Sequence, residues 1–266
     1  MDKSTVGGII VAVAGIIVGL ILEGGRVAQI VQPTAALIVF GGTVGAVMVQ
    51  FPLSTVKDAV RSLVQVFVEK EQKSGKVIEE LIQYAHKARR NGIVSLDEDL
   101  PNIKDPFLRR SLTLAVDGTN PGELRKIMEL ELDNQAEQDE YVPHVFESAG
   151  GFAPTVGIIG AVLGLIQVMQ HLENINEVGK GIAVAFVATI YGVGSANILF
   201  LPWAGKLKIR FRRQQLLREM TLEGVISILE GSNPRALQEK LEGYLTQRLT
   251  GKIKEVGDAV EGAVRA

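Results

Sequence analysis

The sequence has no cysteine among its 266 residues. Disulfides, thiolate metal sites and a cysteine nucleophile are therefore excluded. Aromatic residues are also scarce, and no arginine-rich segment is interleaved with them, so the sequence gives no reason to expect nucleic-acid binding. The histidines, His86, His144 and His171, are scattered, and no spacing typical of a metal site occurs. We therefore expect no enzyme, no metal site and no cofactor.

Charge is absent from four long apolar segments. Residues 4–22, 33–51, 152–171 and 181–202 contain no Asp, Glu, Lys or Arg, and each is long enough to cross a bilayer. A mean hydropathy of +0.22 and a hydrophobic content of 47% agree with this interpretation. The sequence predicts an all-α, polytopic membrane protein with four transmembrane helices and a helical cytoplasmic domain.

The basic residues predict the orientation of the chain. Of 28 Lys and Arg residues, all but Lys3, Arg26 and Lys180 lie in residues 52–150 or 203–266. Basic segments stay on the cytoplasmic side, so both termini should be cytoplasmic. The predicted organisation is a first transmembrane hairpin (1–51), a cytoplasmic helical domain (52–150), a second hairpin (151–202) and a cytoplasmic helical tail (203–266). Loops 23–32 and 171–180 should then face outside.

Local signals predict helices in the cytoplasmic segments. Apolar residues recur at helical spacing in 56–67, where Ser54 could cap the helix, and again in 77–85, before Gly92 ends the pattern. Pro121 is suited to the first turn of a third helix, which should run to about residue 141. In the tail, Asn233 is a candidate cap and Pro234 a candidate first helical residue.

Small residues and prolines mark the membrane segments. Three spans carry glycines four residues apart, which favours close packing of helices in lipid; the pairs are Gly15 with Gly19, Gly41 with Gly45, and Gly160 with Gly164. Pro154 and Pro202 should both lie near the cytoplasmic face, where a proline in a helix produces a kink or hinge.

The four segments lack the ionisable residue that ion relays usually contain. Two interpretations remain from these residues alone. The chain is either a passive membrane scaffold or one wall of an ion path whose acid comes from another chain.

Four motifs resemble the MotA family, the stator subunits of the bacterial flagellar motor. These are "RRNGIVSLD" at 89–97, "GGFAPTVGIIGAVLGLIQVM" in the third span, "GIAVAFVATIYGVGSANILFLPWAGKLK" in the fourth, and "EGVISILEGSNPRALQEKLEGYL" in the tail. The resemblance implies an ion-conducting stator subunit in the bacterial inner membrane and a MotB-like, single-span partner that supplies the ion-binding aspartate. It also implies a lipid-embedded ring of five copies around two partner helices, and contact with the rotor switch protein FliG.

The resemblance assigns roles to individual residues. Pro154 and Pro202 match the prolines that couple ion flow to movement, and Thr189 matches a threonine beside the ion path. Ala161 occupies a position where sodium-driven relatives carry threonine, and a methyl group offers no oxygen ligand to a hard cation. We therefore expect proton coupling, although Thr189 and backbone carbonyls leave sodium open.

The rotor contact is assigned in the same way. Arg89 and Asp97 match the charged pair that meets the rotor, and Arg90 extends this surface. Many relatives have Glu where this chain has Asp97, so the adjacent Glu98 is an alternative. The nearest alternative function is an ExbB-like or TolQ-like proton-driven transducer, but those chains have one span before the cytoplasmic region, whereas this chain has two.

Overall fold

The computed structural model describes residues 2–68 and 74–243, which are helical and contain no β-strand. Four of the described helices are long and apolar enough to cross a membrane, which confirms the predicted fold class. The elements are α1 (Lys3–Leu22), η1 (Val27–Ile30), α2 (Pro33–Gln50), α3 (Leu53–Phe67), α4 (Ser74–Asn91), η2 (Ile93–Leu96), η3 (Leu100–Asn102), α5 (Pro106–Val116), α6 (Pro121–Gln170), α7 (Ile175–Ser195), η4 (Ala196–Phe200) and α8 (Leu201–Leu229).

The chain forms two compact units. The first unit combines Met1–Lys70 with Asp139–Ile209 and contains the apolar helices. The second combines Glu71–Gln138 with Arg210–Ala266.

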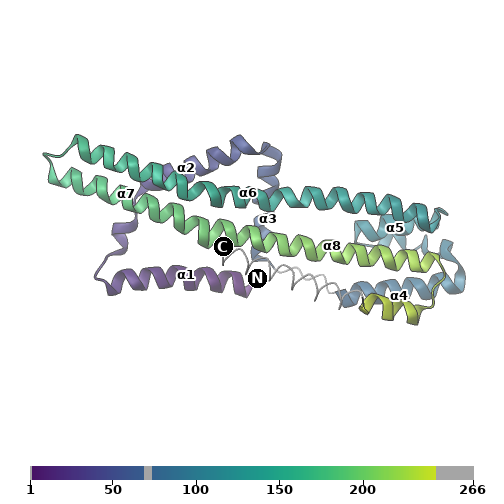
Figure 1. Cartoon of the computed structure of the whole chain (residues 1–266). Coiled ribbons are helices and arrows are strands. Elements are labelled where there is room, and N and C mark those ends of the chain that lie inside the picture. The colour runs from purple at the N-terminus through teal and green to yellow at the C-terminus, as the bar shows by residue number, and fades with distance from the viewer. Residues whose placement is uncertain (1, 69–73, 244–266) are drawn as a thin grey trace. The chain divides into compact units, whose positions relative to one another are not determined.

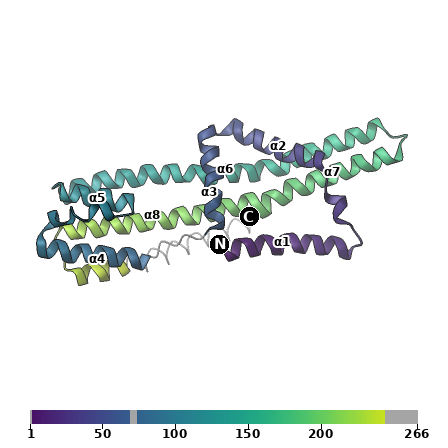
Figure 2. The same ribbon diagram turned by 180° about the vertical axis from the view of Figure 1, so that it is seen from behind.

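In the first unit, α7 runs beside the second half of α6 and also contacts α2 (Figure 1; Figure 2). Ala35 and Val39 of α2 are buried against Val187 and Ala188 of α7. By contrast, α1 has no buried residue. Within one chain, α1 is therefore held mainly through its ends.

Glycines allow α6 and α7 to approach until their backbones touch. A Cβ added at Gly157 would lie 2.9 Å from the Ala188 carbonyl oxygen, and one added at Gly164 would lie 2.7 Å from the Gly181 carbonyl oxygen. On the facing helix, a Cβ at Gly192 would lie 2.5 Å from the Ala153 carbonyl oxygen. Such close approach is what small residues provide in lipid.

The predicted glycine pairs have different surroundings. The prediction of close packing is confirmed for Gly160 and Gly164, because α7 occupies the space beside both residues. A Cβ at Gly15, Gly19, Gly41 or Gly45 would meet nothing within 4 Å among the described residues. Packing at those two pairs stays a prediction, because it would involve another chain.

The second unit has a conventional apolar core. Leu81 of α4, Leu108 and Leu112 of α5, Met128 of α6 and Met220 of α8 are each at most 1% exposed and belong to one cluster. The amphipathic helices α4 and α5 turn their apolar faces toward this cluster, and their polar faces remain exposed.

A charge cluster joins three segments of the second unit. Glu223 of α8 accepts hydrogen bonds from Arg125 Nη2 at 2.9 Å and from Lys240 Nζ at 2.5 Å. Burial acts to raise the pKa of Glu223, but these two cations outweigh it, so the pKa is lowered. The cluster connects α6, α8 and the helical segment that begins at residue 234.

Most predicted helix boundaries agree with the structure. Gly92 ends α4 with a φ of 83°, a conformation that glycine adopts without strain. Pro121 begins α6, and the Asn233 side chain accepts from the Arg235 N–H at 3.1 Å at the start of the last described helix. The Ser54 cap was wrong, because α3 begins at Leu53 after Pro52, with no side-chain cap.

The third predicted span is not a separate helix. The helix that begins at Pro121 continues to Gln170 through Pro143 and Pro154. An internal proline costs a helix ~3 kcal/mol, but residues on the same stretch, including Phe146 and Ala153, are buried and so favour continuity. The next helix also starts earlier than the predicted span, at Ile175, because Asn174 caps it by accepting from the Asn176 N–H at 3.2 Å.

Candidate functional site

Pro154 lies in the first unit, at a point where the backbones of α6 and α7 are in close contact. A Cβ at Gly192 would be 3.2 Å from the Pro154 Cα and 3.1 Å from the Gly157 Cα. Pro154 has no N–H to donate to the preceding turn. One of the two proline interruptions in the hydrogen-bond ladder of α6 therefore lies where α7 packs against it.

Thr189 is a half-buried residue of α7, and its hydroxyl donates to the Ala185 carbonyl oxygen at 3.2 Å. A hydroxyl that donates in this way keeps lone pairs that can accept a hydrogen bond. Ala161 is half-buried on α6, next to Gly160, whose added Cβ would lie 2.7 Å from the Ala188 Cβ. Ala161 on α6 and Thr189 on α7 thus each follow directly after a residue of the same contact, that between Gly160 and Ala188.

Pro202 follows an irregular turn that the sequence did not reveal. Residues Ala196–Phe200 form a π-helix, η4, in which the Leu201 N–H reaches back five residues to the Ala196 carbonyl oxygen. Pro202 comes next and has no N–H to donate. Single π turns are common at functional sites, and prolines weaken the helix ladder. The end of the fourth span therefore contains two adjacent interruptions of the regular α-helical hydrogen-bond pattern.

The predicted rotor residues lie together at one turn of the second unit. Arg89 and Arg90 are in the last turn of α4, and Asp97 follows η2 after the Gly92 turn. All three side chains are exposed, and none has an ion pair within residues 2–68 and 74–243. They remain available to an outside partner.

Glu98 differs from Asp97 in this respect. Lys87 Nζ lies 3.6 Å from Glu98 and 2.8 Å from Asp99. The hydrogen bond to Asp99, with a smaller contribution from Glu98, raises the pKa of Lys87. The structure thus leaves Asp97 unpaired, while Glu98 already has a cation beside it.

A small apolar hollow adjoins Arg89. It has a volume of about 260 Å³, and its walls include Ala85 and Ile93 on one side and Ile228 and Leu229 on the other. Sequence reasoning missed this hollow because its two walls come from segments more than 130 residues apart, and only tertiary packing brings them together.

Comparisons with known proteins show which family the chain belongs to. Residues 99–220 match the MotA/TolQ/ExbB proton channel family, and residues 6–92 match the motility protein A N-terminal domain. Motility protein A of Bacillus subtilis (strain 168) is 37% identical over 98% of this chain and 97% of its own length. Chemotaxis protein PomA of Vibrio alginolyticus is 30% identical over 93% of this chain and 96% of its own length.

Solved structures show the same fold. The chain aligns with the structure of C. jejuni MotAB at a TM-score of 0.87 and 33% identity, over 92% of this chain and 96% of that one. It aligns with the flagellar MotAB stator complex of Bacillus subtilis at a TM-score of 0.83 and 36% identity, over 94% and 99% of the two chains. These matches and the four apolar helices show that the chain belongs to the MotA/TolQ/ExbB proton channel family, among its motility protein A members.

Proposed function

We propose that this chain, a stator subunit of the bacterial flagellar motor, forms one wall of a proton path whose ion-binding carboxylate belongs to a MotB-like partner. The observation that carries the proposal is the absence of Asp, Glu, Lys and Arg from all four apolar segments. A proton path needs an ionisable group. A family member without such a group must obtain it from another chain.

The α6–α7 pair is suited to line such a path. Its helices pack backbone against backbone, and Thr189 keeps an acceptor that can take a hydrogen bond from a protonated carboxyl or a water molecule. Protonation of the partner's aspartate removes its charge and weakens its demand for polar contacts. Five copies of this chain would surround the partner helices and step around them as protons pass.

Movement of this wall would reach the rotor protein FliG through the exposed charges at Arg89, Arg90 and Asp97. Pro154 and Pro202 supply the points at which α6 and the end of the fourth span can bend. With the basic segments in the cytoplasm, both termini and this charged turn lie on the rotor side of the inner membrane. We assign no enzymatic activity to the chain.

The alternative, an ExbB-like or TolQ-like transducer, shares the family of residues 99–220. It does not account for the match of residues 6–92 to the motility protein A N-terminal domain, or for a hairpin of two spans before the second unit. These features favour the stator.

The test uses tethered cells that lack their own stators and receive this chain with its MotB-like partner. Rotation should persist when external sodium is removed at constant pH and stop when a protonophore is added. The Ala161→Thr variant should show whether a hydroxyl at this position confers a sodium requirement. Rotation of the unaltered chain that requires sodium would overturn proton coupling, and no rotation with both proteins in the membrane would favour the transducer.

A further inference from the structure

The start of α8 is fixed to its surroundings immediately after Pro202. The Trp203 ring packs edge-on against Phe67 of α3, Phe146 of α6 and Phe200 of η4, with ring centroids 6.0 to 6.1 Å apart. This aromatic cluster brings three helical segments of the first unit to a point one residue beyond the proline. Aromatic pairs in this geometry are worth about 0.5–1.5 kcal/mol each beyond the area that they bury.

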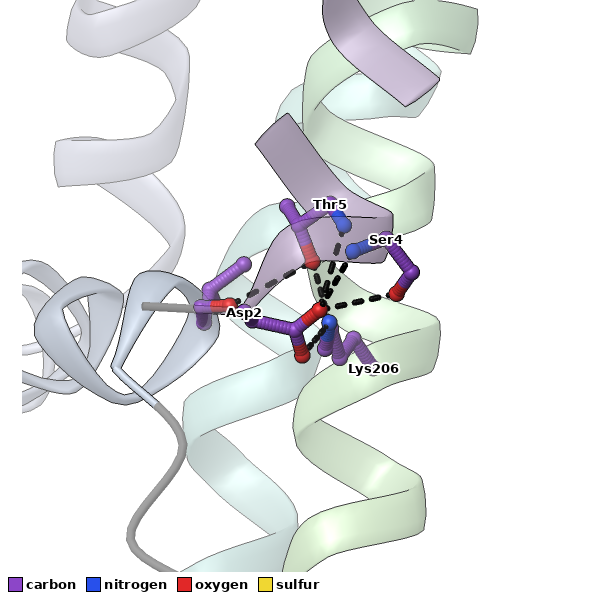
Figure 3. Close-up of polar contacts among 5 residues, drawn as sticks. Asp2, Ser4, Thr5 and Lys206 are labelled. Atoms are coloured by element: carbon purple, nitrogen blue, oxygen red, sulfur yellow. Dashed lines mark hydrogen bonds and ion pairs between the residues drawn. The ribbon is translucent and has the colours of Figure 1, made fainter. Parts of the chain in front are cut away.

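One helical turn further along, Lys206 donates hydrogen bonds to the Asp2 carboxylate and the Thr5 hydroxyl (Figure 3). The Asp2 side chain is 10% exposed and that of Lys206 22% exposed. A charge this far from water is costly unless it is paired and hydrogen-bonded. Both requirements are met here.

Asp2 makes hydrogen bonds through both its side chain and its backbone. Its Oδ1 accepts from the Ser4 N–H at 3.0 Å, the Ser4 hydroxyl at 2.8 Å and the Thr5 N–H at 3.2 Å, so it also caps α1. The Asp2 N–H donates to the Phe67 carbonyl oxygen at 2.8 Å. The hydrogen bond from Lys206, followed by that from Ser4, holds the pKa of Asp2 far below its usual range. Asp2 therefore remains charged at any pH that a bacterial cytoplasm reaches.

We propose that Asp2, Thr5 and Lys206 form a clasp that positions the Pro202 hinge by fixing the start of α8 to α1 and the end of α3. The inference rests on the proposed stator function. Because α1 has no buried residue, the clasp ties its N-terminal end to α3 and α8 where side-chain burial does not. The clasp fixes α8 on one side of Pro202. Bending at the π turn and the proline therefore moves α7 relative to a fixed α8. The clasp stays closed throughout the cycle.

The first test removes the ion pair and leaves the helix cap in place. Asn caps a helix about as well as Asp, so Asp2→Asn removes the charge but keeps the cap. Lys206→Met removes the other charge. Lys3→Met is the matched control, since Lys3 is exposed and has no ion pair in the described part of the chain. The measurement is bead rotation as stators join a motor one by one, where the step height reports torque per stator and the number of steps reports assembly.

Each clasp variant should lose step height while the number of steps stays that of the unaltered chain. The double variant should be no worse than the more severe single variant, because both remove the same interaction. Unchanged step heights in both single variants would overturn the proposal. A fall in step number alone would also overturn it, because the pair would then serve assembly and not torque.

A second test asks whether the clasp opens. The chain has no cysteine, so within one chain a cross-link in the variant Asp2→Cys/Lys206→Cys can form only at the chosen pair. A short bis-methanethiosulfonate reagent, which replaces the length of the lost lysine side chain, should join the two positions, and the cross-linked stators should keep or regain their step height. If this cross-linker stops rotation and a reductant restores it, the clasp must open and the proposal is wrong. Absence of rotation in the unaltered chain would instead count against the proposed function, and the cross-link yield would still report whether the two residues meet.

Discussion

Gly192 offers the sharpest test of the backbone contact between α6 and α7. In Gly192→Ala, the new methyl group would lie 2.5 Å from the Ala153 carbonyl oxygen, whereas ordinary van der Waals contact begins near 3.4 Å. The two helices must therefore separate by about 0.9 Å, the difference between these distances. Backbone atoms have no alternative rotamer, so local rearrangement cannot relieve the clash.

The expected loss can be estimated against a matched control on the same helix. Gly194→Ala gains the same ~1 kcal/mol of helix propensity, and its methyl group meets nothing within 4 Å. The difference between the two variants then isolates the overpacking penalty, about 1–3 kcal/mol. Thermal unfolding of the stator complex purified in detergent should show a lower midpoint for Gly192→Ala than for Gly194→Ala. Equal midpoints would refute a close contact at Gly192.

Three further predictions concern single side chains. Asp97→Lys should reduce swimming in soft agar more than Glu98→Lys, because Asp97 is unpaired and Glu98 already faces a lysine; equal losses would contradict this. Thr189→Ser should retain tethered-cell rotation that Thr189→Val loses, because serine keeps the hydroxyl acceptor, and retention by valine would exclude a polar role. The lowered pKa of Glu223 means that its ionised form stabilises the fold above its ordinary pKa of 4.5, and that this contribution disappears as the pH falls below that value. Glu223→Gln should therefore lower the unfolding midpoint at neutral pH but not in acid, and a constant difference across a pH series would refute the linkage.

The sequence predicted the four membrane spans and their helical character because long uncharged segments leave few alternatives. Helix boundaries were predictable where a residue type strongly favours one local conformation, as at Gly92, where the chain turns with a φ of 83°. The continuity of α6 was not predictable. Pro143 and Pro154 both suggest an interruption, and only the burial of neighbouring side chains accounts for the uninterrupted helix.

The candidate site also has a part that the sequence predicts and a part that only the structure shows. The charged residues near Gly92 could be found from local motifs, and the structure adds that Asp97 and not Glu98 is unpaired. The ion pair between Asp2 and Lys206 joins residues 204 positions apart, and no local pattern connects them. The π turn before Pro202 was also hidden, because it depends on which carbonyl the Leu201 N–H selects.

The glycine contact between α6 and α7 also determines how the pair responds to force. An interface made of side chains is compliant, because rotamer changes absorb part of a displacement. Where Gly157, Gly164 and Gly192 place backbone against backbone, little can yield. The two helices should act as one stiff lever, with bending concentrated where this contact ends, at Pro154 on α6 and at the π turn and Pro202 after α7. A stroke that begins at one end of this lever would then reach the other with little lost to internal deformation.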